Sequence, residues 1–243
     1  MDRIVLDRRV DIGKAVVIKG PPLEALCFQG GRVGSLVTLT DSEGSDFRGR
    51  VTCLSKTEGS VFIFGAFASP TESSLEMILL QALPEKERME LIIQKTTELG
   101  VSTILPFQSE RSIFLREREA KQRKAHRWQH IAVNAVRQSR RAKVPYVGEC
   151  RPLGEVLGDL GEDGLKILLW EKEGENLKSV LRQQAIQKIC VMVGPEGGFT
   201  EQEVKAARKT GFIPVKLGQR ILRTETAAIV LVGILQYELG DLS

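Results

Sequence analysis

Two short loops near the carboxy end hold the residue types that could do chemistry. The first, GPEGGF (residues 194–199), follows an apolar run that ends at Val193. Its glycines, Gly194, Gly197 and Gly198, tolerate positive φ angles, so backbone N–H and C=O groups can approach a flat ligand closely. The spacing matches neither the G-x-x-x-x-G-K-[ST] loop nor the G-x-G-x-x-G loop, which disfavours ATP phosphates and NAD as ligands. Composition alone also fits a plain turn.

The second loop, LGQRILRTETA (residues 217–227), surrounds two apolar side chains with polar ones. Ile221 and Leu222 need burial, either against the core or against the face of an adenine-like ring. The flanking arginines could stabilise a developing negative charge, and the carboxylate of Glu225 could accept a proton. We expect Thr224 to cap the helix that follows.

Alternating strands and helices must position these loops. From residue 76 onward, short apolar runs alternate with apolar residues at helical spacing, separated by Gly and Pro. Strands are expected at 76–82, 101–107, 165–170, 189–193 and 212–217, and helices at 84–99, 117–138, 175–187, 200–211 and 225–239. This order predicts an α/β fold with a largely parallel sheet covered on both faces. Ligands of such sheets bind beyond the carboxyl ends of strands, where both loops fall.

Residues 15–67 show a different pattern. Short apolar runs at 15–18, 36–39, 51–54 and 61–67 are separated by Gly, Ser and Asp. They are typical of a small antiparallel β-sheet or barrel. The stretch Ser69–Ser74 ends the pattern, and we place a boundary there between an N-terminal domain, residues 1–72, and a C-terminal domain, residues 73–243.

Positive charge is concentrated in residues 111–143. This segment holds eleven basic and two acidic residues, whereas the whole chain of 243 residues has a net charge of only +4. Because Lys and Arg neutralise phosphate, the excess indicates a nucleic-acid-binding surface, with a solvated helix face as the alternative. Trp128, inside the segment, would either stack on a base or anchor the helix to the core.

Several functional classes are disfavoured. Four widely spaced cysteines without a C-x-x-C pair indicate neither a zinc site nor a disulfide framework, and we expect them to be small core residues. His126 and His130 share a helix face but lack a third ligand at suitable spacing, so no metal is expected. The longest apolar run near the end, 227–235, is nine residues, where about 20 are needed to span a membrane. The start of the chain is charged and shows no secretion signal, so we expect a cytoplasmic protein.

The two loops together resemble a known family. GPEGGFT followed by LGQRILRTETA is similar to the 16S rRNA (uracil-1498-N3)-methyltransferase family of the SPOUT superfamily. Further matches, over about residues 76–239, are KTTELGV (95–101), Arg111-Ser112, Arg127-Trp128, Gln138-Ser139-Arg140 and Pro145. The resemblance implies a homodimer that transfers a methyl group from S-adenosylmethionine to N3 of one uridine in the 16S rRNA of the small ribosomal subunit. It also implies a SPOUT-type parallel sheet with a C-terminal trefoil knot, and a small N-terminal PUA-like β-barrel that binds RNA.

The resemblance assigns roles to individual residues. The cofactor would be bound by Trp170, Gly194, Glu196, Gly197, Gly198, Leu217, Gly218, Ile221, Leu222 and Thr226. RNA would be bound by Arg32, Arg111, Arg127, Gln138, Arg140 and Arg141. Methylation at N3 requires a cation that stabilises the anion, for which we expect Arg223, with Arg220 as second choice. Glu225 and Glu196 are the candidate proton acceptors, but the helix N-terminus favours the charged form of Glu225, and bracing a loop against an arginine is an equal alternative for it.

One departure from the family leaves alternatives open. Family members carry a His and a Val-Leu-Arg motif before the glycine that corresponds to Gly34, whereas this chain has LCFQGGRV at 26–33, where we expect Arg32 to substitute. The alternatives are a SPOUT enzyme that acts on another atom, such as a ribose 2′-hydroxyl, or on another RNA, and a non-catalytic RNA-binding assembly factor. The last helix, 225–239, is so apolar that it is either wholly internal or meets a second subunit, and we expect a dimer.

Overall fold

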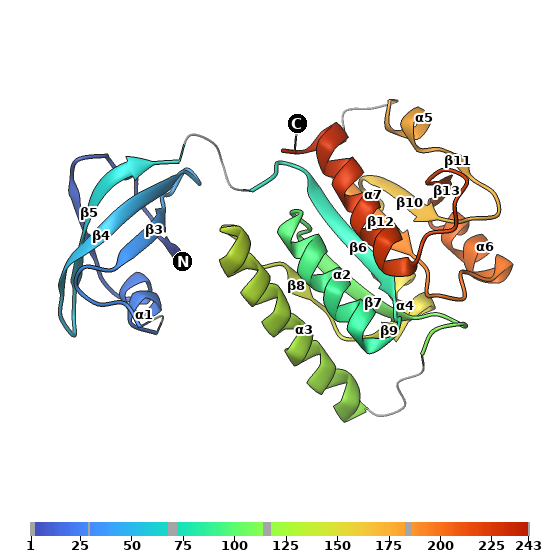
Figure 1. The fold of residues 1–243 in the computed structure, drawn as a ribbon, viewed down its shortest axis with the longest axis horizontal. Helices are drawn as coiled ribbons and strands as arrows, with labels where there is room; N and C mark the ends of the chain where they lie inside the picture. Colours follow the sequence, from blue (N-terminus) through green and yellow to red (C-terminus); the bar gives the residue numbers. More distant parts are fainter. Residues whose placement is uncertain (1–2, 29, 68–71, 114–117, 183–185, 243) are drawn as a thin grey trace. The chain divides into compact units, whose positions relative to one another are not determined.

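The computed structural model describes residues 3–28, 30–67, 72–113, 118–182 and 186–242, without the side chains of Arg3 and residues 118–123 (Figure 1). The chain divides into two compact units, one of residues 1–72 with 140–142, the other of residues 73–139 with 143–243. Some residues named in the predictions lie outside the described ranges. They are Arg116, residues 69–71 of the expected boundary, and residues 183–185 of the expected helix at 175–187. None of the helices in the described ranges is both long and apolar enough to span a membrane.

The N-terminal unit combines a five-stranded sheet with a helix. Its elements are β1 (Arg3–Val5), β2 (Ala15–Ile18), α1 (Pro21–Phe28), β3 (Leu36–Thr40), β4 (Asp46–Leu54) and β5 (Gly59–Ala66), in the strand order β1-β3-β4-β5-β2. β1 pairs with β3 in parallel, and the other pairs are antiparallel. Alternate residues of β5, Val61 and Ile63, enter a core that Leu23 and Leu26 of α1 complete. The strand pattern did not predict β1 or α1, although Pro21 at a helix start is a favourable signal.

Two of the four cysteines are not core residues. Cys150 and Cys190 are buried, but Cys27 and Cys53 are exposed, so the expectation was wrong for these two. For Cys53 the reason is visible in the sheet, because the register of β4 against β5 shifts between Val51 and Cys53. Such a shift breaks the strict alternation of faces and turns the side chain outward.

The C-terminal unit is built on a parallel sheet. Its strands are β6 (Glu76–Ala82), β7 (Thr103–Gln108), β8 (Tyr146–Val147), β9 (Arg151–Pro152), β10 (Leu165–Leu169), β11 (Glu175–Asn176), β12 (Lys188–Val193) and β13 (Ile213–Lys216), in the order β11-β13-β10-β12-β6-β7-β8, with β9 paired to β7. The strand pairs of this sheet among the described residues are all parallel. The predicted α/β class with a parallel sheet is therefore confirmed.

Helices cover both faces of this sheet (Figure 1). The helices α2 (Lys86–Glu98), α3 (Arg118–Ser139), α5 (Leu177–Leu181) and α7 (Thr224–Leu239) belong to one apolar core, and α4 (Leu153–Asp159) and α6 (Glu201–Lys209) to the other. Neighbouring strand residues point to opposite cores, as Leu79 and Leu80 do. Trp128 of α3 is buried in the first core, so it anchors the helix and does not offer its ring to a base. The sequence pattern did not predict α4, because Gly154 and Gly158 interrupt its helical spacing.

The end of α7 is fastened to the start of the C-terminal unit. Gln236 is fully buried, and its Oε1 accepts a hydrogen bond from the Ser73 hydroxyl at 2.8 Å. A side chain at Gly100 or Gly240 would collide with the Gln236 amide. A buried amide therefore holds the two ends of this unit together, and two glycines leave room for it.

Candidate functional site

Three loops meet at the carboxyl ends of neighbouring strands. β13, β10 and β12 lie side by side, and the chain leaves them through residues 217–223, 170–172 and 194–199. These loops surround a cavity of about 630 Å³, a volume typical of small-molecule sites. Its lining comprises Arg88, Ala227 and residues 169–172, 193–199 and 215–224. Both loops predicted to carry chemistry thus contribute to one cavity.

Backbone geometry shapes the loop after β12. Gly198 has a φ of +67°, in the left-handed region that L side chains disfavour. Its N–H donates to the carbonyl oxygen of Pro195 at 3.0 Å. A Cβ at Gly198 would stand 3.0 Å from Oε1 of Glu171. The next residue, Phe199, is buried and stacks on Phe107 with ring centroids 6.3 Å apart. The loop therefore turns tightly above an aromatic anchor.

Two further contacts brace this loop from the segment after β7. The guanidinium of Arg111 donates to the carbonyl oxygen of Gly197 at 2.8 Å. Thr200 and Glu203 form the predicted capping box at the start of α6, which is confirmed. Oε1 of Glu203 also accepts the backbone N–H of Glu110 at 2.9 Å. The capping residue therefore connects α6 to the same segment that holds Gly197.

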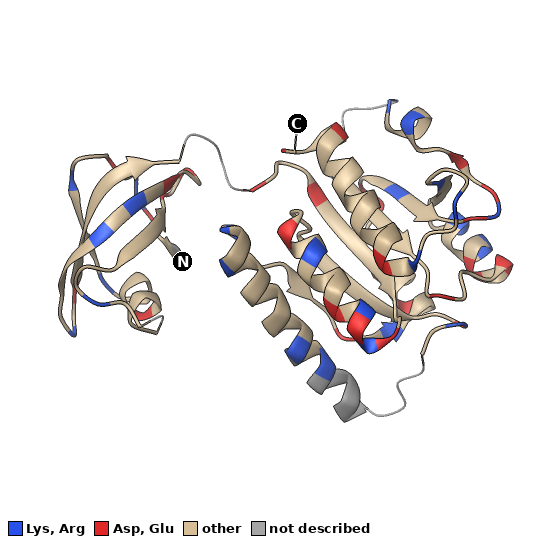
Figure 2. Ribbon diagram, in the orientation of Figure 1, with Lys and Arg blue, Asp and Glu red and all other residues tan. Residues whose placement is uncertain are grey.

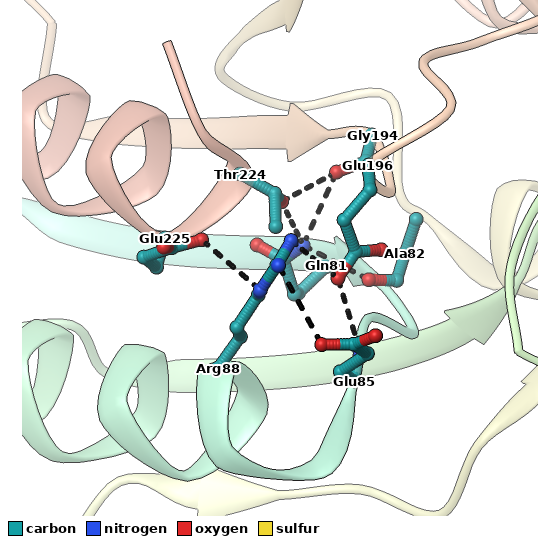
Figure 3. Close-up of polar contacts among 8 residues, drawn as sticks. All are labelled: Gln81, Ala82, Glu85, Arg88, Gly194, Glu196, Thr224 and Glu225. Carbon is teal, nitrogen blue, oxygen red and sulfur yellow. Dashed lines mark hydrogen bonds and ion pairs between the residues drawn. The ribbon is translucent and has the colours of Figure 1, made fainter.

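Thr224 joins the two loops. Its hydroxyl donates to the carbonyl oxygen of Gly194 at 2.6 Å and accepts from Nε2 of Gln81 at 3.1 Å (Figure 3). The Gln81 amide also donates to the carbonyl oxygen of Ala82 at 2.9 Å. The expectation that Thr224 caps α7 is wrong, because Arg223 occupies the N-cap position and no side chain caps the helix. The hydroxyl is used instead to connect the start of α7 to the end of β12.

Arg88, in the first turn of α2, contacts carboxylates from three segments (Figure 3). Its Nη1 lies 3.1 Å from Oε1 of Glu196, and its Nη2 lies 3.5 Å from Oε2 of Glu85. Its Nε lies 4.0 Å from Oε2 of Glu225, an atom that is buried without a hydrogen-bond partner among the described residues. Figure 2 shows acidic and basic residues mixed at this end of α2. Sequence reasoning missed Arg88; its place in the first turn after a strand of the sheet was the available signal.

The structure brings together most of the residues expected at the cofactor. Those that line the cavity are Trp170, Gly194, Glu196, Gly197, Gly198, Leu217, Gly218, Ile221 and Leu222, together with Arg220 and Arg223. Thr226 and Glu225 are not among the lining residues. Ile221 lines the cavity and is 89% exposed, so the alternative of burial against the core is wrong. The described residues contain no group of three His, Cys, Asp or Glu that could hold a metal ion.

The residues expected at RNA have varied surroundings. Arg111 braces Gly197, as described above, and Nε of Arg127 pairs with Oε1 of Glu90 at 2.7 Å. Within the N-terminal unit, Arg141 is buried and its Nη2 pairs with Oε2 of Glu72 at 2.8 Å. The exposed members of the set are Arg32, Gln138 and Arg140. Arg111, Arg127 and Arg141 therefore already contact protein groups.

A protein-family model matches most of the chain. The model of a family described as an RNA methyltransferase domain matches residues 71–236. This chain belongs to that RNA methyltransferase family. The match spans β6 to α7 and thus includes all three loops around the cavity.

Relatives within the family carry a more specific name. A "Ribosomal RNA small subunit methyltransferase E" from Buchnera aphidicola is 33% identical over 195 residues, which cover 80% of this chain and 76% of the relative. A protein of the same name from Bacillus subtilis is 28% identical over 211 residues, covering 84% of this chain and 82% of the relative.

A solved structure shares the fold over the whole chain. It is a ribosomal RNA small subunit methyltransferase E from Neisseria gonorrhoeae bound to S-adenosyl methionine. The identity is 32%, the TM-score is 0.76, and the match covers 100% of both chains.

Proposed function

We propose that this protein transfers a methyl group from S-adenosylmethionine to N3 of uridine 1498 in the 16S rRNA of the small ribosomal subunit, in the cytoplasm. Membership of the RNA methyltransferase family supports methyl transfer to RNA, and the names of the relatives support the small-subunit RNA. One observation carries the proposal. The loops after β10, β12 and β13 enclose a cavity of about 630 Å³, in a chain with the fold of a relative that was crystallised with S-adenosyl methionine.

The residues of the cavity suit this cofactor. Apolar side chains, among them Leu169, Val215 and Leu222, form walls that accommodate a flat ring. The glycine loop after β12 offers backbone N–H and C=O groups at close range, because no Cβ intervenes. Ile221 stands exposed where it would cover a bound ring. When bound, S-adenosylmethionine supplies a methyl group attached to a positively charged sulfur.

The chain's own residues handle the proton and the charge. Removing the N3 proton leaves negative charge shared with O2 and O4, and a fixed cation nearby lowers the barrier. Arg223 lines the cavity and supplies this cation, with Arg220 as the alternative. Glu225, two residues further along, accepts the proton. Its side chain is 14% exposed and lies beside Arg88, which itself lines the cavity.

A homodimer belongs to the same proposal. α7 buries Ala228, Leu231 and Leu235 against the sheet, yet Val230 and Tyr237 remain 38% and 61% exposed. An apolar stripe of this kind on a surface helix supports contact with a second copy.

The finer topology is proposed as well: a C-terminal trefoil knot and a PUA-like form of the N-terminal sheet. Both rest on the resemblance of residues 194–200 and 217–227 to the SPOUT family.

Binding of rRNA has its support in the charge of the segment 111–143. Figure 2 shows basic residues towards both ends of α3. Phosphate neutralisation by such residues gives affinity without sequence preference, and Arg32 and Arg140 add exposed cations. Trp128 makes no contribution through its ring, because it is buried.

Mass spectrometry of nucleosides tests the proposal. 16S rRNA from a deletion strain, compared with the same strain carrying the gene, should lose 3-methyluridine and nothing else. Loss of a 2′-O-methylated nucleoside instead would establish the alternative reaction at the ribose. No lost nucleoside, combined with no calorimetric binding of S-adenosylmethionine at millimolar concentration, would establish a non-catalytic RNA-binding factor.

A further inference from the structure

One arginine connects both loops of the cavity through their acidic residues. Glu196 lies in the loop after β12, and Glu225 lies in the first turn of α7, after the loop that follows β13. Among the described residues, Arg88 is the cation within ion-pair distance of both. Arg88 itself comes from α2, a third segment of the chain. Its side chain therefore sets where the two carboxylates lie relative to each other.

The two carboxylates are held very differently. Oε1 of Glu196 accepts from Nη1 of Arg88 and from the backbone N–H of Glu85, each at 3.1 Å. Oε2 of Glu225 lies 4.0 Å from Nε of Arg88 and has no hydrogen-bond partner among the described residues. Glu196 is thus a fixed anchor for the guanidinium, whereas Glu225 is oriented by charge alone and keeps its capacity to accept a proton.

Partial burial makes this orientation effective. The side chains of Arg88 and Glu225 are 29% and 14% exposed, and attraction between charges increases as water is excluded. Glu85 and Glu196 also contact Arg88. Two further cations, Arg220 and Arg223 of the loop before α7, line the same cavity as Arg88. Three carboxylates share one guanidinium, so Arg88 is the group that keeps Glu225 from being repelled by Glu85 and Glu196.

We propose that Arg88, which lines the cavity, is a positioning residue that holds the neighbouring Glu225 carboxylate so that it accepts the uridine N3 proton. This role rests on the proposed function, in which Glu225 is the acceptor. The N3–H bond breaks and an O–H bond forms on Glu225. The electron pair left on N3 forms the bond to the methyl carbon, while the pair of the methyl–sulfur bond remains on the sulfur, which becomes neutral.

The geometry requires arginine in particular. The contacts use three different nitrogens, Nη1, Nη2 and Nε, which point in different directions from one planar group. The single ammonium of lysine cannot make these contacts together. A lysine at residue 88 would keep the charge but lose the anchor on Glu196 or the approach to Glu225, so it should rescue activity only in part.

The test is a double-mutant cycle with the full-length protein and small-subunit rRNA. The variants are Arg88→Gln, Glu225→Gln and the two combined, with Arg88→Lys as the conservative change. Lys95→Gln serves as the control, because Lys95 lies on the same helix and pairs only with Glu98 among the described residues. Each variant is measured for kcat, for the KM of S-adenosylmethionine and for thermal unfolding.

A positioning role predicts a specific pattern. Arg88→Gln should lower kcat about 10²-fold, the size expected for a misplaced catalytic group. The KM should change less than about fivefold, since an ion pair as exposed as that with Glu196 contributes little. The combined variant should be no slower than Glu225→Gln alone, because a lost positioning residue cannot act through a missing acceptor. Arg88→Lys should recover part of kcat, and Lys95→Gln should match the wild type.

Other results overturn the proposal. An unchanged kcat in Arg88→Gln would do so, and so would losses that multiply in the combined variant, since Arg88 would then act independently of Glu225. Should Arg88→Gln fail to fold, the same cycle with Arg88→Lys decides between these outcomes. If the wild-type protein forms 3-methyluridine and one of these two results is found, only the role of Arg88 is rejected. Wild-type protein that methylates a different atom rejects the proposed function and the acceptor with it.

Discussion

The hydroxyl of Thr224 donates a 2.6 Å hydrogen bond to the carbonyl oxygen of Gly194, thirty residues earlier in the chain. This bond joins the two loops of the cavity, since Gly194 begins one and Thr224 directly follows the other. The amide of Gln81 donates to the same hydroxyl at 3.1 Å and is fully buried. The spacing of the loops therefore depends on one threonine.

Thr224→Ala should weaken both the fold and cofactor binding. The carbonyl of Gly194 loses its 2.6 Å donor and keeps only a 3.5 Å contact from Nε2 of Gln81. The Gln81 amide loses one acceptor and keeps the carbonyl oxygen of Ala82, so the loss should cost about 1–3 kcal/mol in total. Thermal unfolding and calorimetry with S-adenosylmethionine measure the two effects. Thr224→Ser keeps the hydroxyl and should retain most of both. Equal affinities in the alanine and serine variants would show that the hydroxyl does not set the cavity.

Gly198→Ala should reduce the affinity for S-adenosylmethionine. The residue has a φ of +67°, and an L residue there costs about 1–2 kcal/mol. The added Cβ would also stand 3.0 Å from Oε1 of Glu171, at the wall of the cavity. Gly161→Ala is the matched control, because nothing lies within 4 Å of a Cβ there and its φ is ordinary. Calorimetry measures the affinity of both variants for S-adenosylmethionine. Equal affinities would contradict a role of Gly198 in shaping the cavity.

Arg223→Ala should lower turnover and leave cofactor binding nearly intact. Loss of one fixed donor at a developing anion reduces kcat by about 10²–10³-fold. Single-turnover methylation of rRNA at saturating S-adenosylmethionine measures the chemical step. Arg220→Ala, tested in parallel, decides between the two arginines that line the cavity. A larger loss of turnover in Arg220→Ala than in Arg223→Ala would show that Arg220 stabilises the anion.

Arg140 and Arg141 should respond differently to alanine substitution. Arg141 is 6% exposed and pairs with Glu72, which is 18% exposed. Its removal should lower the unfolding free energy by about 3 kcal/mol, the low end for breaking a buried pair. Arg140 is exposed, and its removal should reduce the salt dependence of rRNA binding by about one unit of slope. Filter binding across a salt series, together with thermal unfolding, separates these effects. If Arg141→Ala reduced the salt dependence of rRNA binding and left the unfolding free energy unchanged, Arg141 would instead be a residue that contacts phosphate.

Thiol labelling should divide the cysteines into two classes. Burial raises the pKa of Cys190 from 9.0 to about 12, so at pH 8 this thiol stays protonated and unreactive. Cys27 and Cys53 are exposed and should react quickly in the native protein. Since the folded state keeps the Cys190 proton that the unfolded state loses above pH 9, stability should fall as the pH rises from about 9 to about 12. Rapid modification of Cys190 at pH 8 would contradict its burial.

Local patterns were sufficient for the elements that hold the cavity. The apolar run of β6 ends before Pro84, and the expected range, 76–82, matches the observed strand. The other long strands of the sheet lie within two residues of their expected ranges, because parallel strands buried on both faces are continuous apolar runs. The two-residue strands β8, β9 and β11 carry no pattern that could be read.

The contacts between segments could not be read in this way. Thr224 satisfies the local rule for an N-cap, but that rule contains no information about Gly194 coming within 2.6 Å of it. Arg88 looks like an ordinary surface charge in the first turn of a helix. Only the folded sheet brings Glu196 and Glu225, which are far from it in the sequence, to the same guanidinium.

The hydrogen bond between Ser73 and Gln236 means that the C-terminal unit starts and finishes at one place. A peptide of a few residues would therefore suffice to connect the two ends of this unit. New chain ends could then be made in an exposed turn such as residues 161–163. The arrangement of the unit in space therefore does not require the present order of its segments along the chain. A circularly permuted C-terminal unit that begins between α4 and β10 should still assemble the three loops around the same cavity.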